Sequence, residues 1–230
     1  MRESITSIPI RDVFAPKDGC PLCRLRDMLE KRVVEYITGA AMMEPDVRIE
    51  TNRLGFCGPH YEQMRGQRNR LGLALLLDSH LQELEKTALK GSPARRGRRE
   101  SATPLRDTAT GSCFVCREVD AAMGRIVSNL CRLWEKDEDF RELFADQPAL
   151  CLPHCRQLCE AAAELPKKSA AALVSASTEL CRRTLTSLHQ EIRHFCSMFD
   201  YRNSGENADF GTSRDAIERT IAFLTARSST

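Results

Sequence analysis

Hydrophobic residues recur every three or four positions along several stretches of the chain, which is the spacing of one face of an α-helix. Two such stretches run from Leu22 to Ala41 and from Leu71 to Leu89, with charged residues between the apolar positions. The same pattern covers Val119 to Trp134, Ala170 to Phe199, and Ser213 to about Ala226. The fourth of these stretches contains neither Pro nor Gly, so we expect one long helix there.

Sustained alternation of apolar and polar residues, the mark of a half-buried strand, is missing from the sequence. Only the segment from Val47 to Thr51, which is rich in β-branched residues, is expected to form a short extended piece. The pattern therefore predicts an all-α fold.

A stretch of different composition, residues 91–112, divides the chain. It is rich in Gly, Pro, Ser, Thr and Arg, and Leu105 is its single large aliphatic residue. Such a composition buries too little apolar surface to offset the entropy of ordering. We expect a flexible Arg-rich linker between two helical halves, residues 1–90 and 113–230, that pack together as one unit.

Composition and charge place the chain among soluble globular proteins, with 42% hydrophobic and 29% charged residues and a net charge of +2. The longest apolar run, Leu71–Leu77, is far shorter than the roughly 18 residues that suggest a membrane span. The N-terminal residues also lack the apolar core of a signal peptide. We expect a cytoplasmic protein that does not bind a membrane. The only basic excess, +3, lies in residues 91–112, so a nucleic-acid partner has weak support.

Eleven cysteines are many for a cytoplasmic chain, where clustered cysteines are more often metal ligands than disulfides. Each half has a Cys-x2-Cys motif followed by a Cys-x2-His motif, and 34 and 35 positions separate the second and third cysteines of the two halves. This shared spacing indicates an internal duplication. The motifs are Cys20/Cys23 and Cys57/His60 in the first half, and Cys113/Cys116 and Cys151/His154 in the second.

Three thiolates and one imidazole form a ligand set that Zn²⁺ favours in a tetrahedral site. We expect one Zn²⁺ in each half, two per chain, held in zinc knuckles. Because four protein ligands leave no position for water, both ions are expected to be structural. The predicted sets are Cys20, Cys23, Cys57 and His60 for one ion, and Cys113, Cys116, Cys151 and His154 for the other.

Longer segments around these motifs resemble a bacterial family known as domain of unknown function 6062. In the first half the resemblance rests on Cys20–Arg26, on Ala41–Cys57 with its Met-Met-Glu-Pro-Asp block, and on Arg70–Leu75. In the second half it rests on Cys113–Cys116, Cys151–His154 and Phe199–Asn203. It extends over nearly the whole chain apart from the Arg-rich linker. The resemblance implies a bacterial cytoplasmic protein, and it implies no activity.

A second group of polar residues lies outside the metal motifs. Alternating polar positions before Cys57 would share one side of an extended segment. An enzyme would use these residues as a polar pocket. In the simpler interpretation, which we favour, the residues before Cys57 form a loop that satisfies its own backbone and supports the metal ligands, and the histidine lies in the core with one hydrogen bond. The segment Phe199–Asn203 is then a docking motif at the end of a helix. The candidate residues are Asp46, Arg48, Glu50, Asn52, His80, Asp200, Tyr201 and Arg202.

The function that the sequence favours is a non-enzymatic binding or regulatory module with a protein partner. Three alternatives remain: an enzyme that uses the polar group, a nucleic-acid-binding regulator that uses the Arg-rich linker, and a thiol switch. The switch hypothesis rests on Cys151, Cys155 and Cys159, which share one helical face, although burial as small hydrophobes explains the same spacing.

Overall fold

The computed structural model describes residues 10–87, 112–200 and 209–226, and these contain ten α-helices and no β-strand. The all-α prediction is therefore confirmed. Within the described residues, no helix is both long and apolar enough to span a membrane. The expected linker lies almost entirely outside the described residues. The helices are α2 (Ile10–Phe14), α3 (Pro21–Thr38), α4 (Pro45–Leu54), α5 (Gly58–Gly66), α6 (Arg70–Thr87), α7 (Phe114–Lys136), α8 (Glu138–Ala145), α9 (Leu152–Ala161), α10 (Lys167–Ser197) and α11 (Ala216–Thr225).

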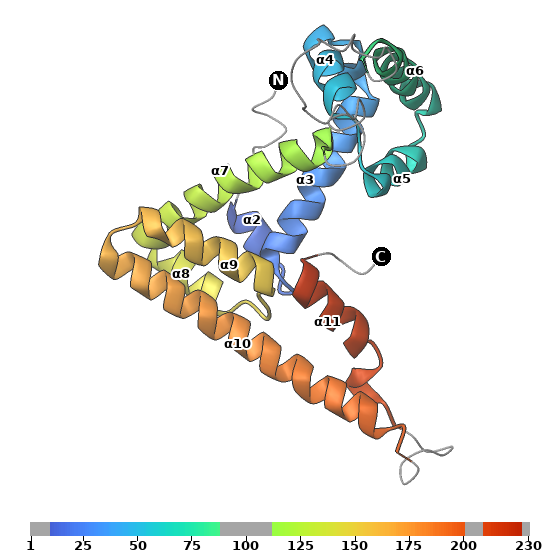
Figure 1. Ribbon diagram of the computed structural model, residues 1–230. Helices are drawn as coiled ribbons and strands as arrows, with labels where there is room; N and C mark the ends of the chain where they lie inside the picture. Colours follow the sequence, from blue (N-terminus) through green and yellow to red (C-terminus); the bar gives the residue numbers. More distant parts are fainter. Residues whose placement is uncertain (1–9, 88–111, 201–208, 227–230) are drawn as a thin grey trace, which may run out of the picture. The chain divides into compact units, whose positions relative to one another are not determined.

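The chain forms two compact units that do not coincide with the two halves of the sequence (Figure 1). Unit 1 comprises Met1–Thr6 and Met28–Ala122, and unit 2 comprises Ser7–Asp27 and Met123–Thr230. Helix α3 begins in unit 2 and ends in unit 1, whereas α7 begins in unit 1 and ends in unit 2. Each unit is therefore built from segments on both sides of residues 88–111.

Unit 1 is centred on the packing of α4 against α6, which lie side by side in Figure 1. The segment Val47–Thr51, expected to be extended, is helical instead. Pro45 occupies the first turn of α4, and Gly55 ends the helix at φ +60°. Both are ordinary helix boundary residues, and they outweigh the preference of β-branched residues for strands. Gly72 lets α6 approach α3, since an added Cβ would lie 2.5 Å from the carbonyl oxygen of Thr38.

Unit 2 is organised around α10, a helix of 31 residues that packs against α9 and α11 (Figure 1). The long helix expected over Ala170–Phe199 is thus confirmed. A cluster of three buried aromatic rings joins α2 to α8. The centroid of Phe14 lies 5.1 Å from that of Phe140 and 5.9 Å from that of Phe144. Asp137 caps α8 by accepting a hydrogen bond from the backbone N–H of Phe140 at 3.0 Å.

Candidate metal centres

The first candidate metal centre lies in unit 2 and joins the starts of α3 and α9. We call it the α3–α9 cluster. It contains Cys20, Cys23, Cys151 and His154, whose ligand atoms all lie within 4.8 Å of one another. The Sγ atom of Cys151 lies 3.8 Å from that of Cys20 and 3.6 Å from that of Cys23. The Nδ1 atom of His154 lies between 3.1 and 3.7 Å from the three sulfurs.

The second candidate centre lies in unit 1 and joins the starts of α5 and α7. We call it the α5–α7 cluster. Its members are Cys57, His60, Cys113 and Cys116. The Nδ1 atom of His60 lies 3.0 Å from the sulfur of Cys57, 3.2 Å from that of Cys113 and 3.5 Å from that of Cys116. The sulfurs of Cys57 and Cys116 are 3.9 Å apart. The cysteines of both clusters are free thiols.

The pairing of the four motifs differs from the prediction. The structure brings together the eight predicted ligands, but each cluster combines the Cys-x2-Cys motif of one half with the Cys-x2-His motif of the other. The predicted sets Cys20/Cys23/Cys57/His60 and Cys113/Cys116/Cys151/His154 are therefore wrong. The physical reason is the continuous helix after each Cys-x2-Cys motif. Helix α3, with 18 residues at a rise of about 1.5 Å per residue, carries the chain away from Cys20 and Cys23 before Cys57 is reached.

All four motifs have the same local structure. The carbonyl oxygen of the first cysteine accepts a hydrogen bond from the N–H four residues later, at distances from 2.9 to 3.3 Å, so each motif forms the first turn of a helix. Cys57 and Cys151 are N-cap residues with nearly equal backbone angles, φ −78° and ψ 161° against φ −74° and ψ 157°. Helix N-termini expose backbone N–H groups and favour thiolate over thiol. Each Cys-x2-Cys motif therefore directs two sulfurs from a helix start to a single point, and each Cys-x2-His motif directs one sulfur and one imidazole in the same way.

Further contacts fix the α5–α7 cluster in unit 1. The backbone N–H of Phe114 donates to the carbonyl oxygen of Gly55 at 3.0 Å, which ties the two motifs together. The outer nitrogen of the His60 ring, Nε2, lies 3.8 Å from Oε1 of Glu30 on α3. A carboxylate beside the outer nitrogen of a ligating imidazole orients the ring and increases its basicity. No role was assigned from the sequence to Glu30, whose spacing does not relate it to the motifs, nor to Gly55, although Gly55 lies two residues before Cys57.

Within each cluster, the pKa of one thiol is lowered and that of at least one neighbouring thiol is raised. Hydrogen bonds with Cys151 and Cys23 hold the pKa of Cys20 well below its ordinary value, although burial opposes this. The contact with Cys20 raises the pKa of Cys151 to about 12. In the other cluster, burial acts to raise the pKa of Cys113, but a hydrogen bond with His60 and backbone hydrogen bonds lower it to about 6.

Burial and the neighbouring charge of Cys113 raise the pKa of Cys116 to about 12. Burial opposes a charge on His60, yet hydrogen bonds with Cys113 and Glu30 raise its pKa to about 10. The pattern follows from repulsion between adjacent negative charges, which allows one thiolate but resists a second. A bound cation removes this repulsion, so both clusters are suited to bind a positive ion.

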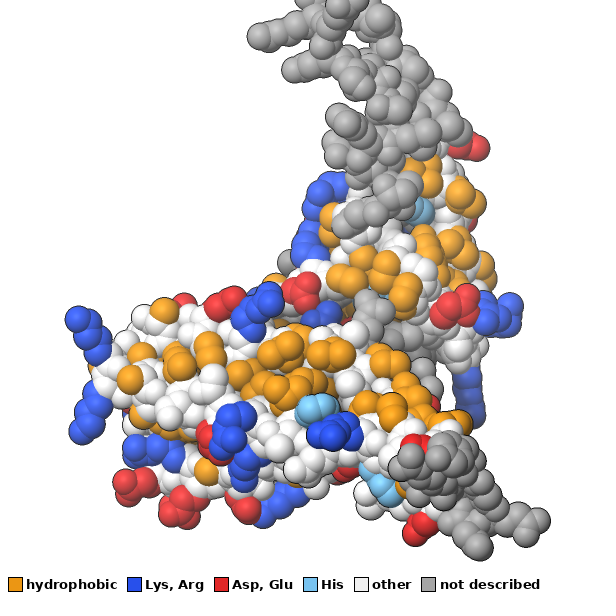
Figure 2. Space-filling view, turned by 60° about the horizontal axis from the view of Figure 1, so that its bottom comes forward, with side chains coloured by type: hydrophobic (Ala, Val, Ile, Leu, Met, Phe, Trp, Pro, Cys, Tyr) orange, Lys and Arg blue, Asp and Glu red, His pale blue; other side chains and the backbone are white. Residues whose placement is uncertain are grey.

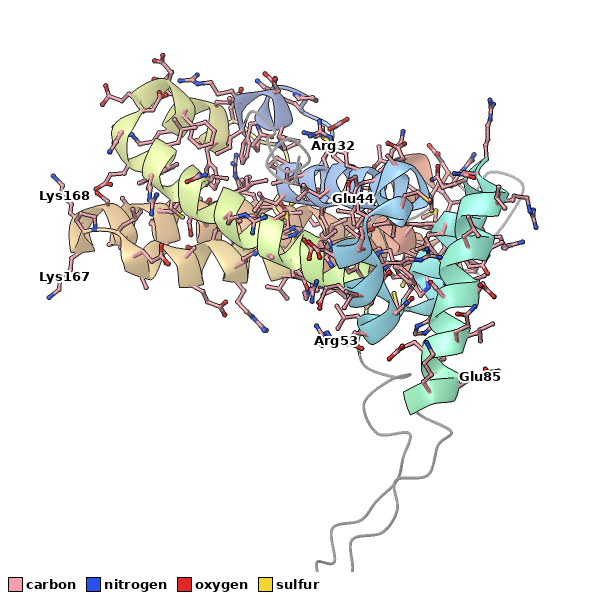
Figure 3. The ribbon with its side chains drawn as sticks, turned by 90° about the horizontal axis from the view of Figure 1, so that it is seen from above. Arg32, Glu44, Arg53, Glu85, Lys167 and Lys168 are labelled. Atoms are coloured by element: carbon pink, nitrogen blue, oxygen red, sulfur yellow. The ribbon has the colours of Figure 1, made fainter. Side chains whose placement is uncertain are left out.

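The polar residues on α4 do not share one side. Because α4 is a helix, successive members of Asp46, Arg48, Glu50 and Asn52 are rotated by about 200° from one another. Glu50 accepts hydrogen bonds from Arg53 at 2.9 Å and from Arg117 at 2.5 Å, and these contacts lower the pKa of Glu50 to about 2. Arg53 points outward from α4 (Figure 3). The expectation of one polar face on an extended segment is therefore wrong.

His80 is 9% exposed, and its Nδ1 lies 2.9 Å from the backbone oxygen of Asn52. This is the core histidine with one satisfied hydrogen bond that the sequence favoured. Asn52 also accepts a hydrogen bond from Ser79 at 3.0 Å, so both side chains join α4 to α6. Asp200 lies in unit 2 near the end of α10. Tyr201 and Arg202 lie outside the described residues.

Three further cysteines lie near the α3–α9 cluster. Cys155 follows His154 on α9 and interacts with Cys159 and with Cys181 on α10. Burial raises the pKa of Cys155 to about 11 and also raises that of Cys181. Protonated thiols are poor nucleophiles, and Cys155 and Cys181 are buried in the manner of small apolar side chains.

Comparison with known proteins gives one match. Neither the curated proteins nor the solved structures include a match to this chain. A family model described as a family of unknown function, DUF6062, matches residues 1–230. The chain therefore belongs to the DUF6062 family.

Proposed function

We propose that this protein is a non-enzymatic binding or regulatory module that carries two structural Zn²⁺ ions, one in each cluster. The carrying observation is the shape of the two donor sets. A tetrahedral Zn²⁺ with sulfur at about 2.3 Å and nitrogen at about 2.0 Å requires edges of about 3.8 Å between sulfurs and about 3.5 Å between sulfur and nitrogen. The sulfur–sulfur distances of 3.6 to 3.9 Å and the sulfur–nitrogen distances of 3.0 to 3.7 Å agree with these edges.

Coordination number supports a structural role over a catalytic one. Catalytic zinc sites commonly have three protein ligands and leave the fourth position for water or substrate. Each cluster here supplies four protein donors, three thiols and one imidazole, which complete the tetrahedron. Zn²⁺ in such a site contributes to the free energy of folding and has no open position for a reacting group.

The positions of the ligands in the chain indicate what the ions stabilise. One ion would link Cys23 to Cys151, which are 128 residues apart, and the other would link Cys57 to Cys116, which are 59 residues apart. The ions would thereby hold together helix starts that are distant in sequence. The long helices of the stabilised scaffold would then offer their surfaces to a protein partner.

We also propose that the two halves arose by duplication. In each cluster a Cys-x2-Cys motif precedes a long helix, α3 or α7, and a Cys-x2-His motif begins a short one, α9 or α5. The exchange is reciprocal, because the first motif of each half meets the second motif of the other. Reciprocal exchange is what a duplicated unit with two equivalent sites would produce.

Metal analysis tests the proposal. Purified full-length protein should contain close to two Zn²⁺ per chain by elemental mass spectrometry, and cobalt substitution should give the absorption of tetrahedral thiolate coordination. Cys20→Ser should reduce the zinc content to about one, and His154→Ala should lower the melting temperature markedly. Cys196→Ser is the matched control, since Cys196 is an exposed cysteine outside both clusters and should retain two ions. Protein without zinc, or ligand variants that melt like the wild type, would contradict the structural role.

A further inference from the structure

A pocket of about 840 Å³ lies in unit 2 beside the α3–α9 cluster. Its volume falls in the range of about 300 to 1,000 Å³ that is usual for small-molecule sites. Four parts of unit 2 line it: the start of α3, the segment before α9, one side of α10, and one side of α11. Three metal-ligand candidates, Cys20, Cys23 and Cys151, belong to the lining.

The apolar part of the lining would hold a hydrocarbon or aromatic group. Leu188 on α10 and Phe223 on α11 are 6% and 5% exposed, and both line the pocket. Pro148, Ala149 and Ala222 complete this apolar surface. The space-filling view shows hydrophobic side chains gathered next to basic ones on the surface of the protein (Figure 2). Apolar walls with few polar groups are typical of sites for small organic molecules.

The basic side chains of the lining form ion pairs, with one exception. Arg24 pairs with Asp18, and Asp146 pairs with Lys17. Arg219 pairs with Glu191 and also with Asp215, the latter at 3.0 Å. Asp27 also has an interaction partner. Each of these side chains therefore already has a partner within the protein.

Arg183 is the exception. Its Nη2 donates a hydrogen bond to the backbone oxygen of Ala145 at 2.9 Å, and within the described residues it forms no ion pair. The guanidinium carries five N–H donors in a planar fork that matches a carboxylate, so most of its donors remain available. Among the described residues of the lining, Arg183 is therefore the basic side chain whose guanidinium is left to pair with a carboxylate.

Gln147 is held in the wall of the pocket by its own hydrogen bonds. It is 1% exposed, and its Nε2 donates to the backbone oxygens of Phe14 at 2.8 Å and Leu143 at 2.9 Å. Its Oε1 is buried and has no hydrogen-bond partner among the described residues.

We propose that this pocket binds an organic carboxylate with an apolar body, the carboxylate paired with Arg183 and the apolar body packed against Leu188 and Phe223. This is a ligand-binding role beyond structural metal binding. The proposal depends on the proposed zinc site in one respect only, because one of its tests measures the loss of zinc from that site. A bound ligand would cover the lining cysteines and slow the loss of metal to a chelator.

The test uses the zinc-loaded full-length protein and matched probes. N-acetylphenylalanine and octanoate carry the carboxylate, whereas N-acetylphenylalaninamide is a neutral analogue of the first with the same body. Calorimetric titration should show saturable binding of at least one of the two carboxylates, with the amide at least tenfold weaker. Arg183→Gln should weaken carboxylate binding about tenfold or more, because hydrogen bonds between charged partners are lost.

Arg182→Gln is the control, since Arg182 is the neighbouring residue on α10, pairs with Glu179 at 2.8 Å, and does not line the pocket. It should leave the affinity unchanged. Ala222→Leu, which narrows the pocket without altering Arg183, should also weaken binding. Absence of binding by both carboxylates, or equal losses in Arg183→Gln and Arg182→Gln, would overturn the proposal.

Metal measurements separate this proposal from the preceding one. Bound carboxylate should slow zinc transfer to a chelating dye from the wild type, and the effect should be lost in Arg183→Gln. If the protein is purified without zinc and still binds a carboxylate, the proposal of structural zinc sites is contradicted and the proposal of a carboxylate pocket is supported. If the protein holds two zinc ions and binds no carboxylate, the zinc sites are supported and the pocket is contradicted.

Discussion

The crossed pairing of the four motifs can be tested with two double variants that remove the same number of thiols. Cys20→Ser with Cys151→Ser removes two ligands from the α3–α9 cluster and leaves the α5–α7 cluster intact. Cys20→Ser with Cys57→Ser removes one ligand from each cluster. If the motifs instead paired within each half of the sequence, the two double variants would exchange their effects.

The magnitude follows from the length of chain that each ion closes. For a cross-link between residues 128 apart, such as Cys23 and Cys151, the chain-entropy relation gives about 5 kcal/mol of stabilisation at 25 °C. A link between Cys23 and Cys57, 34 residues apart, would give about 4 kcal/mol. The double variant Cys20→Ser with Cys151→Ser should therefore lose up to about 5 kcal/mol from this source, while the metal of the other cluster remains.

Zinc content after dialysis against a mild chelator provides the assay, with helix content from circular dichroism as the control for folding. The first double variant should retain about one zinc ion per chain, and the second should retain about none. The opposite result, an empty first variant and one ion in the second, would refute the crossed arrangement. Equal zinc contents in two folded variants would also contradict the crossed arrangement, because the first variant changes one cluster and the second changes both.

Three further predictions concern protons and packing. Zinc binding to metal-free protein should release protons at neutral pH, because the raised pKa values of Cys116 and Cys151, about 12 each, keep these thiols protonated until the metal binds. The affinity for zinc should therefore rise with pH. Calorimetry in buffers of different ionisation enthalpy measures the number of protons released. Gly72→Ala should destabilise unit 1, since its Cβ would lie 2.5 Å from a backbone oxygen, whereas Gly124→Ala, whose Cβ meets nothing within 4 Å, should stabilise α7 by about 0.5–1 kcal/mol in denaturant titrations. Phe140→Ala should cost about 3–5 kcal/mol in the same titrations, and a loss below about 1 kcal/mol would contradict the buried aromatic cluster.

The periodic part of the fold could be predicted from the sequence. Helices α3, α6, α7 and α10 follow apolar positions spaced by three or four, and this spacing directly reports a buried helical face. The eight metal-ligand candidates could also be found, because two residues between donors place both at one helix start. The spacing of donors within a motif is a local property, and local properties are visible in a sequence.

What the sequence did not reveal depends on contacts between distant segments. The partner of each motif is decided by where α3 and α7 lead the chain, and equal spacing in the two halves suggested the shorter connection. The β-branched residues of α4 favour an extended segment, but Pro45 and Gly55 at its ends set the boundaries of a helix. The pocket residues Arg183 and Phe223 lie on different helices of unit 2, and no local pattern links them.

The order in which a ribosome would produce these ligands has a consequence for zinc loading. Cys20, Cys23, Cys57 and His60 all leave the ribosome before Cys113 exists. The nascent chain thus carries a complete set of four donors in a non-native combination. Zinc captured at that stage would have to be exchanged before either final centre could form. A cell that loads this protein efficiently would therefore deliver the metal late, or rely on thiolate exchange fast enough to correct the first choice.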